Sequence, residues 1–126
     1  MSGLKKTSDW RQFERVRPRE GIENEVTFRL EASNREHRVV QVTDVSHFGA
    51  GLRITETLEN GTPARLVMHI DNAEHAVSGH IRWCRTDSGS SSGHESMYHV
   101  GLSFDPNDMS SNMMFFAVLS RYCYLN

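Results

Sequence analysis

The sequence contains few cysteines and no long apolar run. Its 126 residues include two cysteines, Cys84 and Cys123, and no stretch that approaches the roughly 20 apolar residues of a membrane-spanning helix. No CxxC spacing is present, so we expect neither a zinc site nor a redox pair, but two reduced thiols packed as small apolar groups. No apolar stretch follows Lys5 and Lys6, as it would in a secretory signal. We therefore expect a single cytoplasmic domain without membrane insertion.

Motifs that carry catalysis or bind metal ions are missing as well. The seven histidines form no HxH or HxxxH pair suited to a metal. No glycine-rich phosphate loop of the P-loop or Rossmann type occurs, and no serine or cysteine stands in a recognisable nucleophile motif. The serine-rich stretch at 87–96 is instead typical of a flexible loop. These absences argue against an enzyme, and we expect neither a metal nor a cofactor.

Charge is distributed unevenly along the chain. Residues 1–20 carry six basic and three acidic side chains, whereas the remainder carries eight basic and thirteen acidic ones. A basic segment on an acidic body favours an anionic ligand bound by that segment, although a solvated tail has the same composition. Pro18 interrupts any helix there, and no periodicity is visible before residue 23. We therefore expect a flexible arm over 1–22 and a folded domain over 23–126.

From Val26 onward the sequence alternates as strands do. The clearest case is 63–70, and Asp71-Asn72 after it suits a two-residue hairpin turn. The stretch 38–45 is apolar on both faces, which predicts a strand buried on both sides. The expected strands lie near 26–30, 38–45, 52–54, 63–70, 77–84 and 98–104. Six short strands with turns between them predict an all-β fold, a small antiparallel β-barrel.

A helix is expected at the C-terminal end. Asp105 suits the N-cap and Pro106 the first helical position. One face carries apolar residues at i, i+3, i+4 and i+7, and further residues widen that face; they are Phe115, Val118, Leu119 and Tyr122, with Met109, Met113 and Phe116 beside them. We expect this helix to close one end of the barrel, with part of the apolar width left open to a partner as the alternative.

Two short segments carry the chemistry. The first is Arg15-Val-Arg-Pro-Arg19, directly before the first strand. An arginine fork binds phosphate bidentately, bonds the O6 and N7 edge of guanine, or stacks on a purine. The second is Asp44-Val-Ser46-His-Phe-Gly49, at the end of a strand. A carboxylate accepts the N1 and N2 hydrogens of guanine, a serine hydroxyl donates to phosphate or caps a turn, and glycine allows positive φ and close approach of the backbone.

Each segment alone has an ordinary explanation. A surface arginine pair is common, and an Asp-x-Ser-x-x-Gly stretch is often turn chemistry only. Their order, with one short strand between them and a barrel pattern after them, is far more specific.

With these two segments in this order, the sequence resembles the PilZ domain family. The family pattern is RxxxR in an arm followed by [DN]xSxxG after the second strand, here RVRPR and DVSHFG. GHIRW at 79–83 and HVGLSFD at 99–105 are also similar to PilZ strands, and the resemblance covers about residues 11–122. It implies a six-stranded antiparallel barrel with a C-terminal helix that binds cyclic di-GMP.

The resemblance assigns roles to five residues. Arg15 and Arg19 are implied to hold phosphate and guanine, while Asp44, Ser46 and Gly49 form the wall against which the ligand rests. Arg11 also starts an RxxxR frame, and Arg17 lies inside the motif, so both are candidate additional contacts. Glu14 stands where many relatives carry a basic residue, which puts a stacked pair of ligands in doubt, but Arg11 is placed to compensate, so the number of bound ligands stays open.

Two aromatic side chains are candidate contacts as well. Trp83 offers a flat face to guanine, but its alternation with Val77 and Ile81 favours a place in the core. His47 occupies a variable position inside the second motif.

The function expected is a cyclic di-GMP receptor that orders its arm on binding and signals to an unidentified effector protein. A PilZ-like interaction module that binds no nucleotide is the alternative. Nucleic acid is not expected as a partner, because the acidic body repels a long polyanion.

Overall fold

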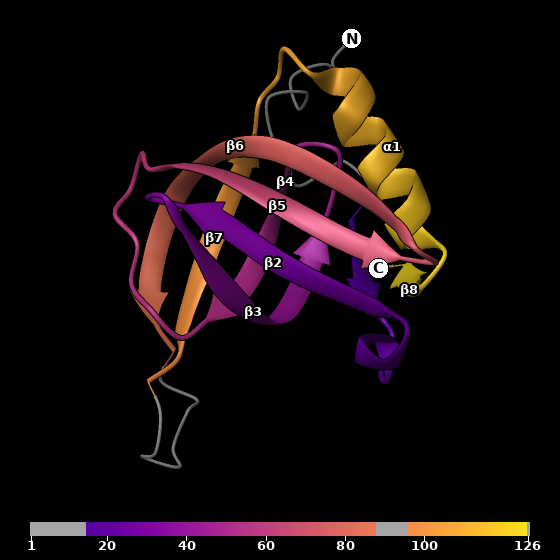
Figure 1. Cartoon of the computed structure of the whole chain (residues 1–126), viewed down its shortest axis with the longest axis horizontal. Coiled ribbons are helices and arrows are strands. Elements are labelled where there is room, and N and C mark those ends of the chain that lie inside the picture. The colour runs from indigo at the N-terminus through magenta and orange to yellow at the C-terminus, as the bar shows by residue number, and fades with distance from the viewer. Residues whose placement is uncertain (1–14, 88–95, 126) are drawn as a thin grey trace, which may run out of the picture.

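The structure, a computed structural model, describes residues 15–87 and 96–125 (Figure 1). Its elements are β1 (Val16–Pro18), the 3₁₀ turn η3 (Ile22–Asn24), β2 (Val26–Ala32), β3 (Arg35–Val45), β4 (Gly49–Ile54), β5 (Pro63–Ile70), β6 (Ala73–Thr86), β7 (Tyr98–Phe104), the helix α1 (Met109–Ser120) and β8 (Cys123–Leu125).

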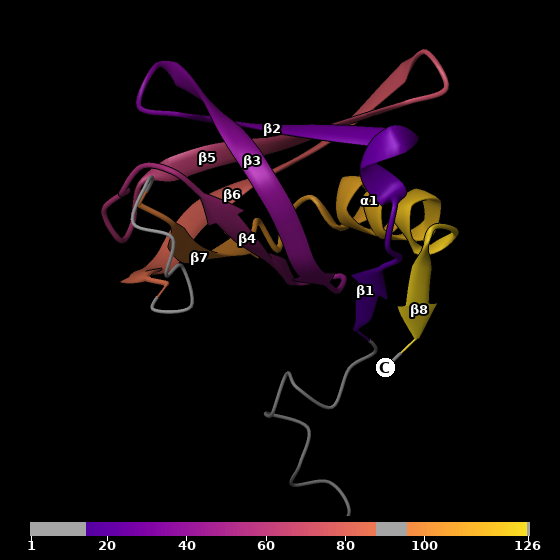
Figure 2. The same cartoon turned by 90° about the horizontal axis from the view of Figure 1, so that it is seen from below.

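Six of these strands form a closed antiparallel barrel. The order is β2-β5-β6-β7-β4-β3, and β3 pairs with β2 to close the ring. Closure pairs both edges of every barrel strand, which removes the exposed edges that promote aggregation. The predicted six-stranded antiparallel barrel is therefore confirmed, and Figure 2 shows the same barrel after a 90° turn.

Alternating side chains build the core of the barrel. On β5, Leu66, Met68 and Ile70 are buried, and the strand continues into β6 through the predicted turn. Asp71 and Asn72 both have left-handed φ angles, 50° and 64°, as two-residue hairpins of the primed type require. The hairpin is confirmed without the glycine that such turns favour.

Strand β3 departs from the expected burial on both faces. Its register shifts twice against β4, between Val39 and Gln41 and again between Val42 and Asp44. Each shift adds a residue and re-aims the side chains that follow, so Val42 and Val45 point into the core while Val40 is exposed. Apolar residues that alternate in the sequence therefore lie largely on one face of the sheet. The expected burial on both sides was wrong at Val40.

Part of the expected arm lies on the barrel. Strand β1 pairs with β3 through Val16 and Val45, and with β8 through Val16, Arg17 and Pro18. Val16 is buried in the core. A three-residue strand is too short to show periodicity, so the prediction of no regular structure over 1–22 was wrong for residues 16–18. Residues 1–14 lie outside the described part of the chain.

Helix α1 begins later than the sequence predicted. Asp105 caps a turn instead of the helix, because its Oδ1 accepts the Asn107 N–H at 2.9 Å and its carbonyl accepts the Asp108 N–H at 3.1 Å. The helix starts at Met109 with Asp108 at the N-cap position. Asn112 then anchors the first turn by donating its Nδ2 hydrogen to the Asp105 carbonyl at 2.9 Å.

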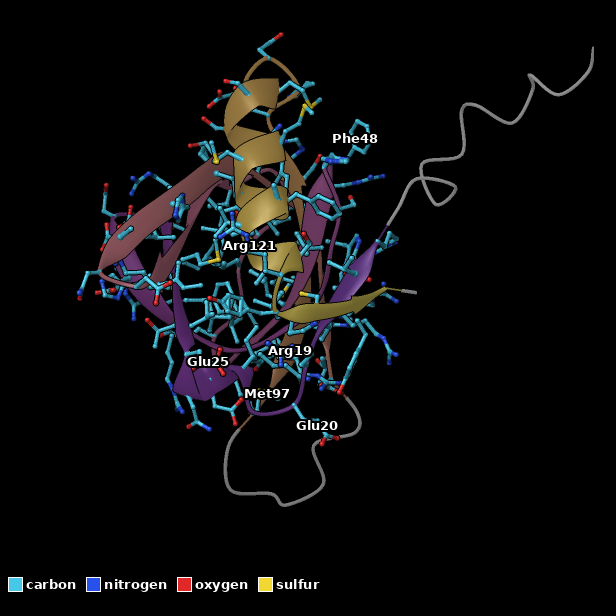
Figure 3. All side chains as sticks on the ribbon, turned by 90° about the vertical axis from the view of Figure 1, so that its right-hand side faces the viewer. Arg19, Glu20, Glu25, Phe48, Met97 and Arg121 are labelled. Atoms are coloured by element: carbon cyan, nitrogen blue, oxygen red, sulfur yellow. The ribbon has the colours of Figure 1, made fainter. Side chains whose placement is uncertain are left out.

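The helix covers one end of the barrel, as Figure 3 shows from that side. Phe115 and Leu119 are buried in the barrel's core cluster, and the Phe115 ring meets Phe104 of β7 edge to face at 6.2 Å. Met113 and Met114 lie on the other side of the helix and are 51% and 57% exposed. The helix therefore closes the barrel with one face and leaves two methionines open. In the described residues, no helix is long and apolar enough to cross a membrane.

Both cysteines are free and half-buried. Burial raises the pKa of the Cys123 thiol to about 11, against a smaller opposing effect of the Arg19 charge. The thiol donates to the Leu119 carbonyl at 3.3 Å. Cys123 is thus a protonated packing group at neutral pH.

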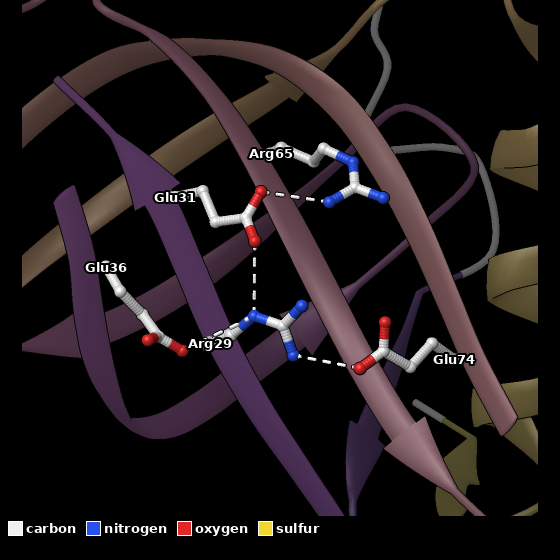
Figure 4. Close-up of polar contacts among 5 residues, drawn as sticks. All are labelled: Arg29, Glu31, Glu36, Arg65 and Glu74. Atoms are coloured by element: carbon white, nitrogen blue, oxygen red, sulfur yellow. Dashed lines mark hydrogen bonds and ion pairs between the residues drawn. The ribbon is translucent and has the colours of Figure 1, made fainter. Parts of the chain in front are cut away.

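The outer face of β2 and β5 carries a cross-strand charge network (Figure 4). Arg29 pairs with Glu31 at 3.2 Å, Glu36 at 3.3 Å and Glu74 at 3.1 Å, and Arg65 pairs with Glu31 at 2.9 Å. Hydrogen bonds from Arg65 and Arg29 lower the pKa of Glu31, and a hydrogen bond from Arg29 lowers that of Glu74. Such solvent-exposed pairs contribute little to stability. The arginines and glutamates of this face already pair with one another.

Candidate functional site

A pocket of about 310 Å³ lies on the surface of the barrel across β6, β7, β4 and β3. It has two charged rims and a floor of small residues. The lining residues are Arg15, Asp44, Ser46, Phe48, Gly49, Ala50, Gly51, Arg82, Trp83, His99, Gly101, Leu102 and Ser103.

Arg15 and Asp44 meet at one rim, although 29 residues separate them in the sequence. The Arg15 guanidinium forms an ion pair with the Asp44 carboxylate, and both side chains are about three-quarters buried, with exposed fractions of 25% and 28%. The antiparallel pairing of Val16 with Val45 brings the start of β1 against the end of β3, and there the Arg15 side chain reaches Asp44. Arg15 of the basic motif and Asp44 of the acidic turn thus lie together, as the sequence predicted for these two residues.

Ser46 and Gly49 shape the turn beside this rim. The Ser46 Oγ accepts the Phe48 N–H at 3.0 Å, and the Ser46 N–H donates to the Gly49 carbonyl at 2.9 Å. Gly49 has no positive φ, contrary to one of the two reasons expected for it. A Cβ there would lie 2.5 Å from the Leu102 carbonyl oxygen, so glycine is needed for the close approach of β4 to β7.

Trp83 lies in the pocket wall and not in the core. A register shift between Ile81 and Trp83 sets Ile81 opposite Leu102 but Trp83 opposite Gly101. Without this bulge, Trp83 would share the inward face with Ile81, as the alternation predicts. The indole lies directly on Gly101, where a Cβ would come within 2.4 Å of its Cε2 atom, and the Arg85 guanidinium lies 4.2 Å from the ring centroid.

His99 joins the wall on β7. Its Nε2 is hydrogen-bonded to Thr43 Oγ1 at 3.2 Å, and its ring meets Trp83 edge to face at 5.1 Å. Burial, followed by the charge of Arg53, lowers the pKa of His99 below its usual 6.5. The site therefore holds a neutral imidazole at pH 7.

The other candidate residues lie elsewhere. The Arg19 guanidinium is 5.8 Å from the centroid of the Tyr122 ring, and its backbone N–H donates to the Tyr122 carbonyl at 2.9 Å. Figure 3 shows Arg19 well apart from Phe48, which lines the pocket. Arg17 is exposed on β1, and the His47 ring packs 4.3 Å from that of Phe116. Arg11 is outside the described residues.

A model of the PilZ domain matches residues 9–125, nearly the whole chain. The chain belongs to the PilZ domain family. No curated protein matches it significantly. PilZ domains are binding and adaptor modules rather than enzymes, and the family is one of cyclic di-GMP receptors. The resemblance drawn from the two motifs is thereby confirmed.

Several residues of the pocket in this PilZ domain were not predicted as site residues. They are Phe48, Ala50, Gly51, Arg82, His99, Gly101, Leu102 and Ser103. Gly51 and Gly101 offered a usable signal, since glycine in a strand often marks a close approach. A Cβ at Gly51 would meet Thr43 Oγ1 at 2.5 Å and Asp44 Oδ1 at 2.9 Å, so this glycine leaves room for the acidic rim.

His99 gives this PilZ domain a predicted loss of stability in mild acid. Folding lowers the pKa of His99, so the folded protein binds a proton at this site less readily than the unfolded chain does. The stability that depends on the neutral imidazole is therefore complete above pH 6.5 and is lost as the pH falls through the pKa of the folded state. We expect the urea concentration at the unfolding midpoint to decrease when the pH is lowered from 7.5 to 5.5, and to decrease less in His99→Gln than in the wild type. An equal fall in both proteins would show that other groups cause the effect.

Proposed function

We propose that this PilZ domain is a receptor for cyclic di-GMP, which binds in the pocket between Arg15–Asp44 and Trp83. On binding, the N-terminal arm orders over the ligand and presents a new surface to an effector protein. The receptor acts in the cytoplasm and uses no cofactor other than this ligand, and nucleic acid is not its partner.

The Arg15–Asp44 ion pair at the pocket rim is the observation that carries the proposal. The two groups are complementary to the two halves of a guanine nucleotide, because a guanidinium binds phosphate or the O6 and N7 edge, and a carboxylate accepts from N1 and N2. In the free protein they neutralise each other. A ligand that offers partners to both replaces one ion pair by two sets of charge-assisted hydrogen bonds.

The remaining predicted residues take supporting roles. Ser46 and Gly49 hold the turn that presents Asp44. Arg19 is proposed to leave Tyr122 and contact the ligand when the arm orders, with Arg11, Arg17 and His47 as additional contacts. Trp83 stacks on a guanine. The ligand can shift the equilibrium toward the ordered arm only as far as it binds that state more tightly than the other. The bound fraction and the ordered fraction should therefore increase together as ligand is added.

Calorimetric titration with cyclic di-GMP tests the proposal. Wild-type protein is expected to bind, and Arg15→Ala and Arg19→Ala each to weaken binding at least about 30-fold, since a charged hydrogen-bonded contact contributes about 2 kcal/mol. Arg121→Ala is the matched control, because Arg121 is exposed beyond the end of α1 and does not line the pocket. Absence of binding heat in the wild type, or wild-type affinity in Arg15→Ala, would refute it.

An interaction module that binds no nucleotide is the second candidate. The exposed Met113 and Met114 on α1 favour it, because flexible apolar side chains suit a protein partner. In that case a fully folded wild-type protein would give no heat with cyclic di-GMP.

A further inference from the structure

The β6 bulge places two consecutive side chains, Arg82 and Trp83, on the outer face of the barrel. Ile81 before them is fully buried, and Arg82 is the extra residue between Ile81, opposite Leu102, and Trp83, opposite Gly101. In a regular strand, neighbouring side chains point to opposite faces. Here both line the pocket. Bulges that re-aim a side chain are frequent beside binding sites, so the local geometry suits recognition.

Among the described residues that line the pocket, Arg82 is the charged side chain that no ion pair neutralises. Arg15 and Asp44, the other charged residues of the lining, form an ion pair with each other. In the described part of the chain, Arg82 has no carboxylate within ion-pair distance, whereas nearby Arg53 pairs with Asp87 at 2.7 Å. The described lining therefore has a net positive charge located at Arg82.

The two rims lie on opposite sides of the pocket. Arg82 is on β6 and Asp44 on β3, with β7 and β4 between them. Neighbouring strands are about 4.8 Å apart, so three spacings put the rims about 14 Å apart along the sheet. Gly49, Gly51 and Gly101 form the floor between the two rims, and the pocket stays open there because glycine has no side chain.

We propose that Arg82 is a further ligand-contacting residue that binds a phosphate at the rim opposite Arg15. This inference rests on the proposed function and adds a residue that lies outside both motifs. A cyclic dinucleotide has two phosphates, and a ligand that lies across β7 and β4 presents one to each rim. Arg82 and Trp83 then act together, one on the phosphate and the other on the adjoining guanine.

Titration of Arg82→Ala and Arg82→Lys with cyclic di-GMP tests this role. We expect Arg82→Ala to weaken binding about 10-fold, the lower end of the range for a charged contact, because Arg82 is exposed to solvent. Arg82→Lys should recover part of the loss, because lysine keeps the positive charge but lacks the planar guanidinium. Arg38→Ala is the matched control, since Arg38 is another exposed strand arginine that does not line the pocket. Thermal unfolding should be unchanged in all three variants.

The outcomes separate the two proposals. If the wild type binds and Arg82→Ala stays within twofold of it, Arg82 does not contact the ligand. If Arg38→Ala weakens binding as much as Arg82→Ala, the effect is general charge and the inference also fails. If the wild type does not bind at all, the proposed function fails, and this inference with it.

Discussion

Replacing Gly79 by alanine is expected to destabilise the barrel by at least about 3 kcal/mol, the upper part of the range for over-packed sites. A Cβ at this position would lie 1.8 Å from the Ser103 carbonyl oxygen, 2.8 Å from the Ser103 carbonyl carbon and 2.9 Å from Phe104 Cα. All three atoms belong to the backbone of β7, so no side chain can rotate away. The methyl group must push β6 and β7 apart where Gly79 pairs with Phe104.

Urea unfolding measures this effect. Gly61→Ala is the control, because a Cβ there meets nothing within 4 Å and the change carries only the strain of a left-handed φ of 89°. That strain costs about 1 kcal/mol. A Gly79→Ala protein that is no less stable than Gly61→Ala would show that the strands accommodate the methyl group freely.

The sequence predicted the barrel well where strands alternate regularly and poorly where they do not. The stretch 63–70 and its Asp71-Asn72 turn could be predicted because side-chain direction follows a period of two. Val40 and Trp83 were misplaced because a bulge shifts that period by one residue, and nothing in the local sequence marks where a bulge occurs. The start of α1 was misplaced because Asp105 caps a turn and a helix equally well.

The site shows the same division. Arg15 and Asp44 could be predicted to meet because the two motifs follow each other in the order and at the spacing of the family pattern. The structure brings them together through β1 and β3. Arg19 could not be separated from Arg15 by sequence, because its contact with Tyr122 depends on the docking of β8 against β1. Arg82 could not be predicted as a site residue, because an arginine in a strand is ordinarily solvated and only the bulge places it beside Trp83.

Phe115→Ala is expected to destabilise the protein by about 3–5 kcal/mol, the range for truncation of a buried phenylalanine. Phe115 is 1% exposed and contacts Phe104 at the end of β7, so its removal leaves a cavity between the helix and the barrel. Phe116, Val118 and Leu119 remain to hold the helix in place. The loss should therefore appear as a lower urea midpoint in a single cooperative transition.

Met114→Ala on the same helix is the matched control. Met114 is exposed, and truncation of an exposed helical side chain to alanine changes stability by about 0.5 kcal/mol or less. Helix α1 contributes no residue to the lining of the pocket, so folded Phe115→Ala protein should bind cyclic di-GMP with wild-type affinity if the proposed function holds. A stability equal to that of Met114→Ala would show that the barrel does not depend on the helix for closure. A loss of binding at a temperature where the variant is fully folded would instead show that the helix positions the pocket through the His47–Phe116 contact.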